Sequence, residues 1–288
     1  MDGSASMCRM SATSRERPIA VFDSGVGGLT VLHELLVALP GEDFVYVGDT
    51  ARFPYGDKSQ DELRTFALEI AEHLLALDAK LLVVACGSAT AAALPLLEER
   101  LAGTGVDVLG VIEPAAQLAV EATRSGRIGL LATSATVASG AFATAIAASS
   151  AQAHVESVAC PDLAPIIQSG FPFDERVVET VRRYTTPLRA ADVDTVILGS
   201  THYPLVAPML QRMLGRGVRL VSSGEGVARA VERTLGPREL LSLRTVEGAY
   251  RFHTTGDPEA FRTLGTRFLQ MQLGEVERIV LTPVEVPV

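Results

Sequence analysis

Residues 83–90 read Val-Val-Ala-Cys-Gly-Ser-Ala-Thr, and residues 196–204 read Val-Ile-Leu-Gly-Ser-Thr-His-Tyr-Pro. In each stretch an apolar run ends abruptly in small polar residues. This pattern is typical of a buried parallel strand that delivers reactive groups to the carboxyl edge of an α/β sheet. The first stretch carries the thiol of Cys86 and the second the hydroxyl of Ser200. If two halves of the chain bring these edges together across a cleft, the two groups could face opposite sides of one small substrate.

Short apolar runs alternate with longer amphipathic segments along the chain, for example the segment 61–77, whose apolar residues recur at helical spacing. Such alternation predicts parallel sheets joined by crossover helices, so the expected fold class is α/β. The predicted strands are 19–22, 44–47, 81–85, 106–111, 128–132, 155–159, 195–198 and 218–221, and the tail adds a helix at 258–272 and a strand at 276–281.

The strands fall into two groups, which predict two similar α/β domains with mainly parallel sheets facing each other across a central cleft. Two glycine-rich segments, Gly103-Thr104-Gly105 and Gly215-Arg216-Gly217, mark the expected crossing points. The expected division is a disordered leader at 1–17, a first domain formed by 18–106 plus 215–288, and an inserted second domain at 107–214.

Composition limits the classes of function. The chain has 288 residues, 48% of them hydrophobic, so it can bury a large core. Its 25 lysines and arginines are scattered among 34 acidic residues, and the net charge of −9 argues against a nucleic-acid surface. The apolar stretches fall far short of the ~20 residues that cross a bilayer, and residues 1–17 lack the apolar core of a secretory signal. We therefore expect neither nucleic acid nor a membrane as partner.

The three cysteines, Cys8, Cys86 and Cys160, lack the close spacing of a zinc site or a redox pair. They predict a cytoplasmic protein with no metal site. Cys86 precedes a helix predicted to begin near Ala89, and a helix amino terminus lowers the pKa of a thiol. From spacing alone, Cys86 is either a reactive thiolate or a buried structural cysteine.

Two loops and one histidine add candidate ligand groups. Residues 23–28, Asp-Ser-Gly-Val-Gly-Gly, form either a tight structural turn or an anion-binding helix start, and they match no nucleotide fingerprint. In the loop after the second strand, Tyr55 could offer a hydroxyl and Gly56 a backbone amide. His202 is either a structural histidine or a general acid or base that could also activate Ser200.

Five motifs, taken in order, resemble the glutamate racemase family. They are residues 22–28, 47–50, 54–56, 84–86 and 198–204, and the resemblance extends from Ile19 to Leu281, including the segment 254–258, Thr-Thr-Gly-Asp-Pro. The resemblance implies a two-domain α/β enzyme that interconverts L- and D-glutamate for peptidoglycan synthesis by thiol-based proton transfer at the α-carbon. It further implies that no cofactor or metal takes part and that the protein is a homodimer.

The resemblance also implies roles for individual residues. Cys86 matches the first of two cysteines that flank the α-carbon, with Asp23 assisting it, and His202 matches the histidine that assists the second. The implied catalytic residues are Cys86, Ser200, Asp23 and His202, and the implied substrate-binding residues are Asp23, Ser24, Pro54, Tyr55, Gly56, Gly87, Ser88, Thr201 and His202.

Four positions depart from the family pattern. Ser200 stands where the second cysteine belongs, and Gly87 stands where an asparagine follows the first. Gln168 and Ser222 stand where acidic residues are expected. A thiol has an ordinary pKa of about 8.5, and a hydroxyl is far less acidic. Ser200 is therefore a poor base unless His202 takes its proton.

Several explanations stay open. The chain could be an impaired racemase, an engineered Cys-to-Ser variant, or a divergent relative with other chemistry. One such relative is a one-cysteine, decarboxylase-like enzyme, in which a single thiol protonates a planar intermediate. Another is a catalytically inactive paralogue that uses the cleft to bind an amino acid.

Overall fold

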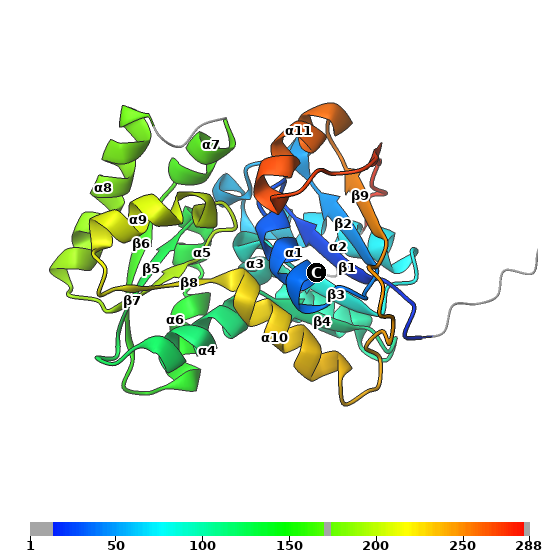
Figure 1. Ribbon diagram of the computed structural model, residues 1–288, viewed down its shortest axis with the longest axis horizontal. Helices are drawn as coiled ribbons and strands as arrows, with labels where there is room; N and C mark the ends of the chain where they lie inside the picture. The colour runs from blue at the N-terminus through cyan, green and yellow to red at the C-terminus, as the bar shows by residue number, and fades with distance from the viewer. Residues whose placement is uncertain (1–13, 170–173, 285–288) are drawn as a thin grey trace, which may run out of the picture.

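Two parallel sheets form the framework of the computed structural model, which describes residues 14–169 and 174–284 (Figure 1). Within these residues every strand pairing is parallel. The larger sheet has the order β10 (Val276–Arg278), β9 (Tyr250–Thr254), β2 (Phe44–Gly48), β1 (Ile19–Asp23), β3 (Leu81–Val84), β4 (Asp107–Gly110). The smaller sheet has the order β6 (His154–Ala159), β5 (Arg127–Ala132), β7 (Thr195–Leu198), β8 (Arg219–Ser222).

The helices alternate with these strands along the chain, so the predicted two-domain α/β fold is confirmed. Residues 1–13 of the expected leader, with Cys8, lie outside the described residues. The α-helices are α1 (Leu29–Ala38), α2 (Gln60–Leu75), α3 (Gly87–Leu101), α4 (Ile112–Ala122), α5 (Ser134–Ala138), α6 (Ala141–Ser149), α7 (Leu163–Gln168), α8 (Glu175–Ala190), α9 (Ala207–Leu214), α10 (Ser223–Leu235) and α11 (Pro258–Leu269). Three short 3₁₀ helices are η1 (Thr50–Arg52), η2 (Tyr55–Asp57) and η3 (Tyr203–Val206).

Local sequence explains where several elements begin. The strand β3 is four consecutive buried apolar residues, as expected for a strand covered on both faces. Helix α2 begins with a capping box, in which the hydroxyl of Ser59 accepts the N–H of Glu62 and the Glu62 carboxylate accepts the N–H of Ser59. Helix α11 begins after Asp257, whose carboxylate accepts the N–H of Ala260 at 2.7 Å. Among the described helices, none combines the length and the apolar character needed to cross a membrane.

The sheet pairings place both domain crossings one strand later than the sequence predicts. The strand β4 pairs with β3 in the larger sheet, and β8 pairs with β7 in the smaller one. A division at 106/107 and 214/215 therefore separates each strand from its partner. The glycines behind that prediction, Gly103, Gly105 and Gly215, have φ values of +79°, +82° and +100°. They form helix-to-strand turns inside a domain rather than crossings.

The strand β9 is absent from the sequence-based prediction. It lies between β2 and β10 and gives the larger sheet six strands. Its residues are Tyr-Arg-Phe-His-Thr, and the last three are buried. Because arginine and histidine interrupt the apolar pattern, this segment has no clear strand period.

The carboxyl edges of the two sheets meet at a glycine. A β-carbon at Gly27, in the turn after β1, would lie 2.3 Å from Thr201 Oγ1 and 2.5 Å from His202 Cε1. The hydroxyl of Thr30 donates to the carbonyl of Thr201 at 2.9 Å, and the hydroxyl of Thr201 donates to Asp23 at 3.4 Å. The residues after β1 and β7 are therefore in direct contact.

We expect Gly27→Ala to destabilise the protein by roughly 1–3 kcal/mol, because the added methyl group has to displace Thr201 and His202. Urea unfolding measures this loss as a lower midpoint. Gly217→Ala is the matched control, since nothing lies within 4 Å of a β-carbon at Gly217. Equal midpoints for the two variants would show that the contact at Gly27 is loose.

Candidate active site

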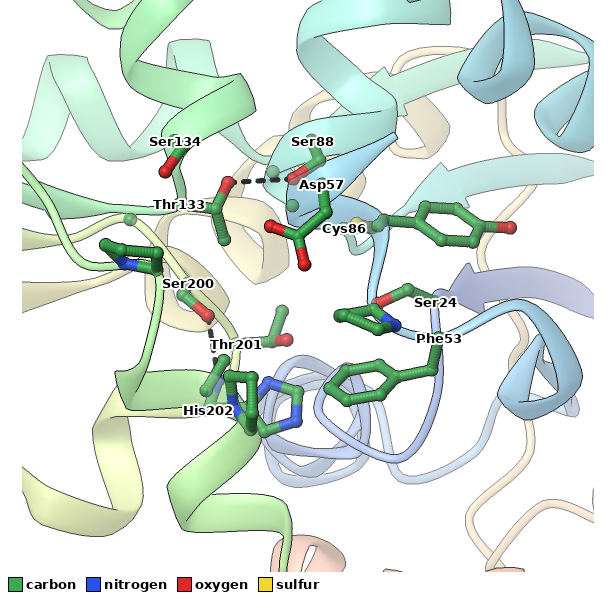
Figure 2. Close-up of a pocket in the computed structure, with 18 residues that line it drawn as sticks. Ser24, Phe53, Asp57, Cys86, Ser88, Thr133, Ser134, Ser200, Thr201 and His202 are labelled. Atoms are coloured by element: carbon green, nitrogen blue, oxygen red, sulfur yellow. Dashed lines mark hydrogen bonds between the residues drawn. The ribbon is translucent and has the colours of Figure 1, made fainter. Parts of the chain in front are cut away.

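A cavity opens between the carboxyl edges of the two sheets (Figure 2). The space inside it is about 30 Å³, less than the ~300–1,000 Å³ of typical ligand pockets, so the cavity is nearly closed in this conformation. All predicted site residues except Asp23 line it: Ser24, Pro54, Tyr55, Gly56, Cys86, Gly87, Ser88, Ser200, Thr201 and His202. The tertiary structure thus brings these residues together from four separate segments of the chain.

Cys86 follows β3 directly and caps the amino terminus of α3. Its thiol nevertheless has a pKa raised to about 12, chiefly because burial disfavours the thiolate and further because Asp23 is nearby. Hydrogen bonds from the backbone N–H of Ala89 and from Ser24 oppose the rise without cancelling it. The expectation of a lowered pKa is therefore wrong for the free protein, in which the thiol is protonated at neutral pH.

Asp23 lies behind the cavity wall and is fully buried. Its Oδ2 accepts the N–H of Gly25 at 3.0 Å, and backbone N–H groups of Gly28 and Ser24 also favour the charged form. Burial is the larger effect and raises the pKa of Asp23. The N–H groups of this turn thus bind the carboxylate of the chain itself, which favours the tight-turn interpretation over an external anion site.

His202 lies on the opposite domain between two aromatic rings. Its ring centroid is 5.6 Å from that of Phe53 and 5.2 Å from that of Phe268. The Nε2 lies 2.8 Å from Oε1 of Gln168; because an amide oxygen only accepts, Nε2 carries the proton and Nδ1 has a free lone pair. Burial lowers the pKa of His202 to about 3, so the ring is neutral near pH 7.

Ser200 follows β7 and lies across the cavity from Cys86 (Figure 2). Its Oγ accepts the backbone N–H of His202 at 3.4 Å. The hydrogen bonds of the described residues pair the imidazole with Gln168 and not with the hydroxyl of Ser200. The geometry therefore gives Ser200 no base to take its proton, and the activation of Ser200 by His202 stays a prediction.

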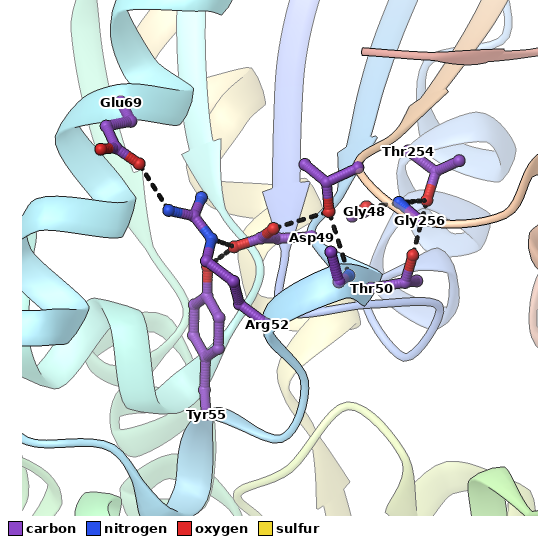
Figure 3. Close-up of polar contacts among 10 residues, drawn as sticks. Gly48, Asp49, Thr50, Arg52, Tyr55, Glu69, Thr254 and Gly256 are labelled. Atoms are coloured by element: carbon purple, nitrogen blue, oxygen red, sulfur yellow. Dashed lines mark hydrogen bonds and ion pairs between the residues drawn. The ribbon is translucent and has the colours of Figure 1, made fainter. Parts of the chain in front are cut away.

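Tyr55 lines the cavity, but its hydroxyl is used elsewhere. The hydroxyl donates to the carboxylate of Asp49, which does not line the cavity (Figure 3). Its role as a substrate-binding residue stays a prediction. Gly56 lies against the second domain, since a β-carbon there would be 3.2 Å from Cβ of Thr133.

A set of hydroxyl groups escaped the sequence-based prediction. Thr133 Oγ1 lies 2.9 Å from Ser88 Oγ and donates to Thr136 Oγ1 at 2.9 Å, so the amino termini of α3 and α5 meet across the domain boundary. Thr133 and Ser134 line the cavity. Their position after β5 is the signal that could have revealed them, because the other site residues also follow strands. Asp57 also lines the cavity and, among the described residues of the lining, is the one with an acidic side chain.

Two of the unusual positions have clear structural surroundings. A β-carbon at Gly87 would lie 2.8 Å from the carbonyl oxygen of Gly199, so the two domains approach too closely for a side chain there. Ser222 ends β8 and caps α10, and it borders a neighbouring pocket rather than this cavity.

The raised pKa of Cys86 predicts its alkylation profile. Below the pKa of a thiol, the thiolate fraction rises about tenfold per pH unit. Iodoacetamide should therefore label Cys86 at a rate that still rises between pH 9 and 10.5, as followed by mass spectrometry of its peptide. The same peptide in urea-unfolded protein is the control, whose rate should level off above about pH 9.5, one unit above the ordinary thiol pKa of about 8.5. A plateau at that pH in the folded protein would contradict the burial argument.

The neutral hydrogen-bond partner of His202 is Gln168, and replacing it with an acidic residue tests their contact. Gln168→Glu puts a carboxylate beside Nε2, which favours the imidazolium and raises the pKa of His202 by roughly 1–3 pH units. A titration of the imidazole Cε1–H by NMR measures the change. Gln117→Glu is the control, because it adds the same charge at an exposed position of α4. This variant should leave the pKa of His202 unchanged. An unchanged pKa in Gln168→Glu would show that the two side chains are not in contact.

Known proteins share both the sequence and the fold. The family model described as Asp/Glu/Hydantoin racemase matches residues 25–231. A glutamate racemase of Beutenbergia cavernae is 44% identical over 94% of this chain and 96% of its own length. The structure of a glutamate racemase isoform from Bacillus anthracis has a TM-score of 0.89 and 37% identity, and the match covers 93% of this chain and 98% of that one. The structure of the glutamate racemase of Francisella tularensis in complex with D-glutamate has a TM-score of 0.85 and 31% identity. That match covers 92% of this chain and 98% of the Francisella chain. The chain therefore belongs to the Asp/Glu/Hydantoin racemase family, within its glutamate racemase group.

Proposed function

We propose that the protein is an isomerase that interconverts L- and D-glutamate by proton transfer at the α-carbon. The observation that carries the proposal is the placement of Cys86 on one wall of the cavity and of Ser200 and His202 on the other. Inversion at one carbon needs a proton removed from one face and another delivered to the opposite face. Relatives named glutamate racemase, one of them bound to D-glutamate, support glutamate as the substrate.

Substrate binding activates the Cys86 thiol in this proposal. Burial and the nearby Asp23 raise its pKa to about 12 in the free protein. The α-ammonium group of a bound amino acid brings a positive charge that opposes both causes. The hydroxyls of Ser88 and Thr133 and the N–H groups at the start of α3 are placed to stabilise the negative charge that develops during proton removal.

The second wall carries weaker proton-transfer groups. Ser200 offers a hydroxyl without a basic partner, and His202 offers the lone pair of a neutral ring. We therefore propose that exchange of the α-proton on the Cys86 face is faster than full inversion. The relatives named above do not favour the decarboxylase-like alternative.

The proposal also covers the pathway, the compartment and the oligomeric state of the enzyme. D-glutamate made by this reaction would serve peptidoglycan synthesis, and the protein would act as a cytoplasmic homodimer. The described cysteines support a reducing compartment, because Cys86 and Cys160 are free thiols. The family resemblance supports the dimer, which light scattering after gel filtration tests by the mass of two chains.

The proposal is tested by incubating the protein with L-glutamate, and separately with D-glutamate, in D₂O. Loss of the α-proton is followed by NMR and inversion by circular dichroism. We expect exchange from one enantiomer to outpace inversion. No exchange from either enantiomer would exclude the proposal and favour an amino-acid-binding protein.

Ser200→Cys sharpens the same test. A thiol on the second wall restores a general acid or base, which typically contributes ~10²–10⁴-fold in rate. We therefore expect a gain in inversion of that order, with less change in exchange on the Cys86 face. The matched control is Ser222→Cys, which adds a thiol outside the cavity and should produce no gain. Equal rates in Ser200→Cys and the wild type would argue for a repurposed pocket.

A further inference from the structure

A hydrogen-bonded cluster lies behind the wall of the cavity, where the end of β2 meets the turn after β9 (Figure 3). Its members are Asp49, Arg52, Tyr55, Glu69 and Thr255, called here the Asp49 cluster. We infer that this cluster sets the position of the loop 50–57, and that Thr255, which does not line the cavity, is a positioning residue for the reaction. This inference rests on the proposed function.

The carboxylate of Asp49 is the centre of the cluster. It is fully buried, and both of its oxygens accept hydrogen bonds. Thr255 Oγ1 donates to Oδ1 at 2.7 Å, and Arg52 Nε donates to Oδ2 at 2.6 Å. The hydroxyl of Tyr55 also donates to Oδ2. A buried carboxylate is costly unless such partners surround it. One side chain thereby fixes both η1 and η2.

The turn after β9 holds the start of the loop. Thr255 Oγ1 accepts the N–H of Ala51 at 3.1 Å in addition to its bond to Asp49. Thr254 Oγ1 lies 2.7 Å from Thr50 Oγ1. A β-carbon at Gly256 would lie 2.3 Å from Thr50 Oγ1. The segment 254–256 therefore packs closely against the loop 50–57, and the absence of a side chain at Gly256 leaves room for Thr50.

Arg52 joins the loop to α2 on the other side. Its Nη1 donates to Glu69, and its guanidinium lies 4.0 Å from the ring centroid of Phe66. The remaining Nη2 is buried with no hydrogen-bond partner. A buried ion pair is weak evidence for stabilisation, and an unsatisfied N–H is a cost. The arrangement is thus better explained by the conformation it imposes than by the stability it adds.

The loop reaches the second domain at two points. The ring of Phe53 lies against that of His202 at 5.6 Å, and Gly56 lies against Thr133. A displacement of the loop therefore moves the contacts of His202 and changes the width of the cavity. Thr255 makes none of these contacts itself, so a kinetic effect of its substitution has to travel through the loop.

Thr255→Val tests the inference, because it removes the hydroxyl and keeps the branched shape. We expect kcat/KM for glutamate to fall roughly tenfold or more, since small displacements of a binding site have large effects, with KM rising. Hydrogen exchange by mass spectrometry should become faster in peptides covering 49–58. Thr255→Ser keeps the hydroxyl and should match the wild type in both measurements.

Glu42→Gln is the control for a purely structural effect. It breaks the Lys80–Glu42 ion pair, whose side chains are 1% and 2% exposed and lie outside the cavity. This variant should lower the urea midpoint and leave KM unchanged. If Thr255→Val also lowers only the midpoint, with wild-type KM and wild-type exchange in 49–58, the inference is overturned.

The two proposals fail in different ways. A wild-type protein that neither racemises glutamate nor exchanges its α-proton removes the proposed function. Backbone hydrogen exchange in peptides covering 49–58 then still tests whether the Asp49 cluster holds the loop. Faster exchange in Thr255→Val, restored in Thr255→Ser, supports the cluster as the group that holds the loop, and equal exchange in all three proteins refutes it.

Discussion

The close approach of two sheet edges governs the rest of this structure. Gly27 leaves room for Thr201 and His202, and Gly87 leaves room for the carbonyl of Gly199. Without β-carbons at these two positions, residues that follow β1 and β3 lie directly against residues that follow β7. The cavity is therefore small and lined from both domains. Electrostatic interactions between groups buried at such a site are stronger than in water, because the surrounding protein screens charges less.

Burial accounts for the protonation states of the candidate catalytic groups. It raises the pKa of Cys86 and of Asp23 and lowers that of His202, so each of these groups tends toward its neutral form in the free protein. The lining contains no lysine or arginine among the described residues. In the proposed reaction, the ammonium group of the substrate brings a positive charge that favours the thiolate form of Cys86. The proposal therefore predicts that a reactive base forms only when substrate is bound.

The departures from the family pattern share a physical consequence. Ser200 offers a hydroxyl where the sequence resemblance leads us to expect a thiol, and Gln168 gives His202 an amide partner, which stabilises an imidazolium less than a carboxylate would. Both changes leave the second wall neutral. The first wall keeps its thiol, and the loop beside it is held by the Asp49 cluster from β2, α2 and the turn after β9. One side of the cavity thus offers a thiol for proton transfer, and the other offers a hydroxyl and a neutral imidazole.

The α/β class, most strands and the strand-end residues that line the cavity could be predicted from local sequence, because apolar periodicity and turn chemistry are local properties. Ordered motifs also carried the family resemblance. The position of β9 between β2 and β10, the pairing of β4 and β8 with their own sheets, and the hydrogen bond from Tyr55 to Asp49 became visible only in the folded chain. The tertiary structure also reversed the expected direction of the pKa of Cys86. These properties depend on partners and burial contributed by residues far apart in the chain, which no local pattern records.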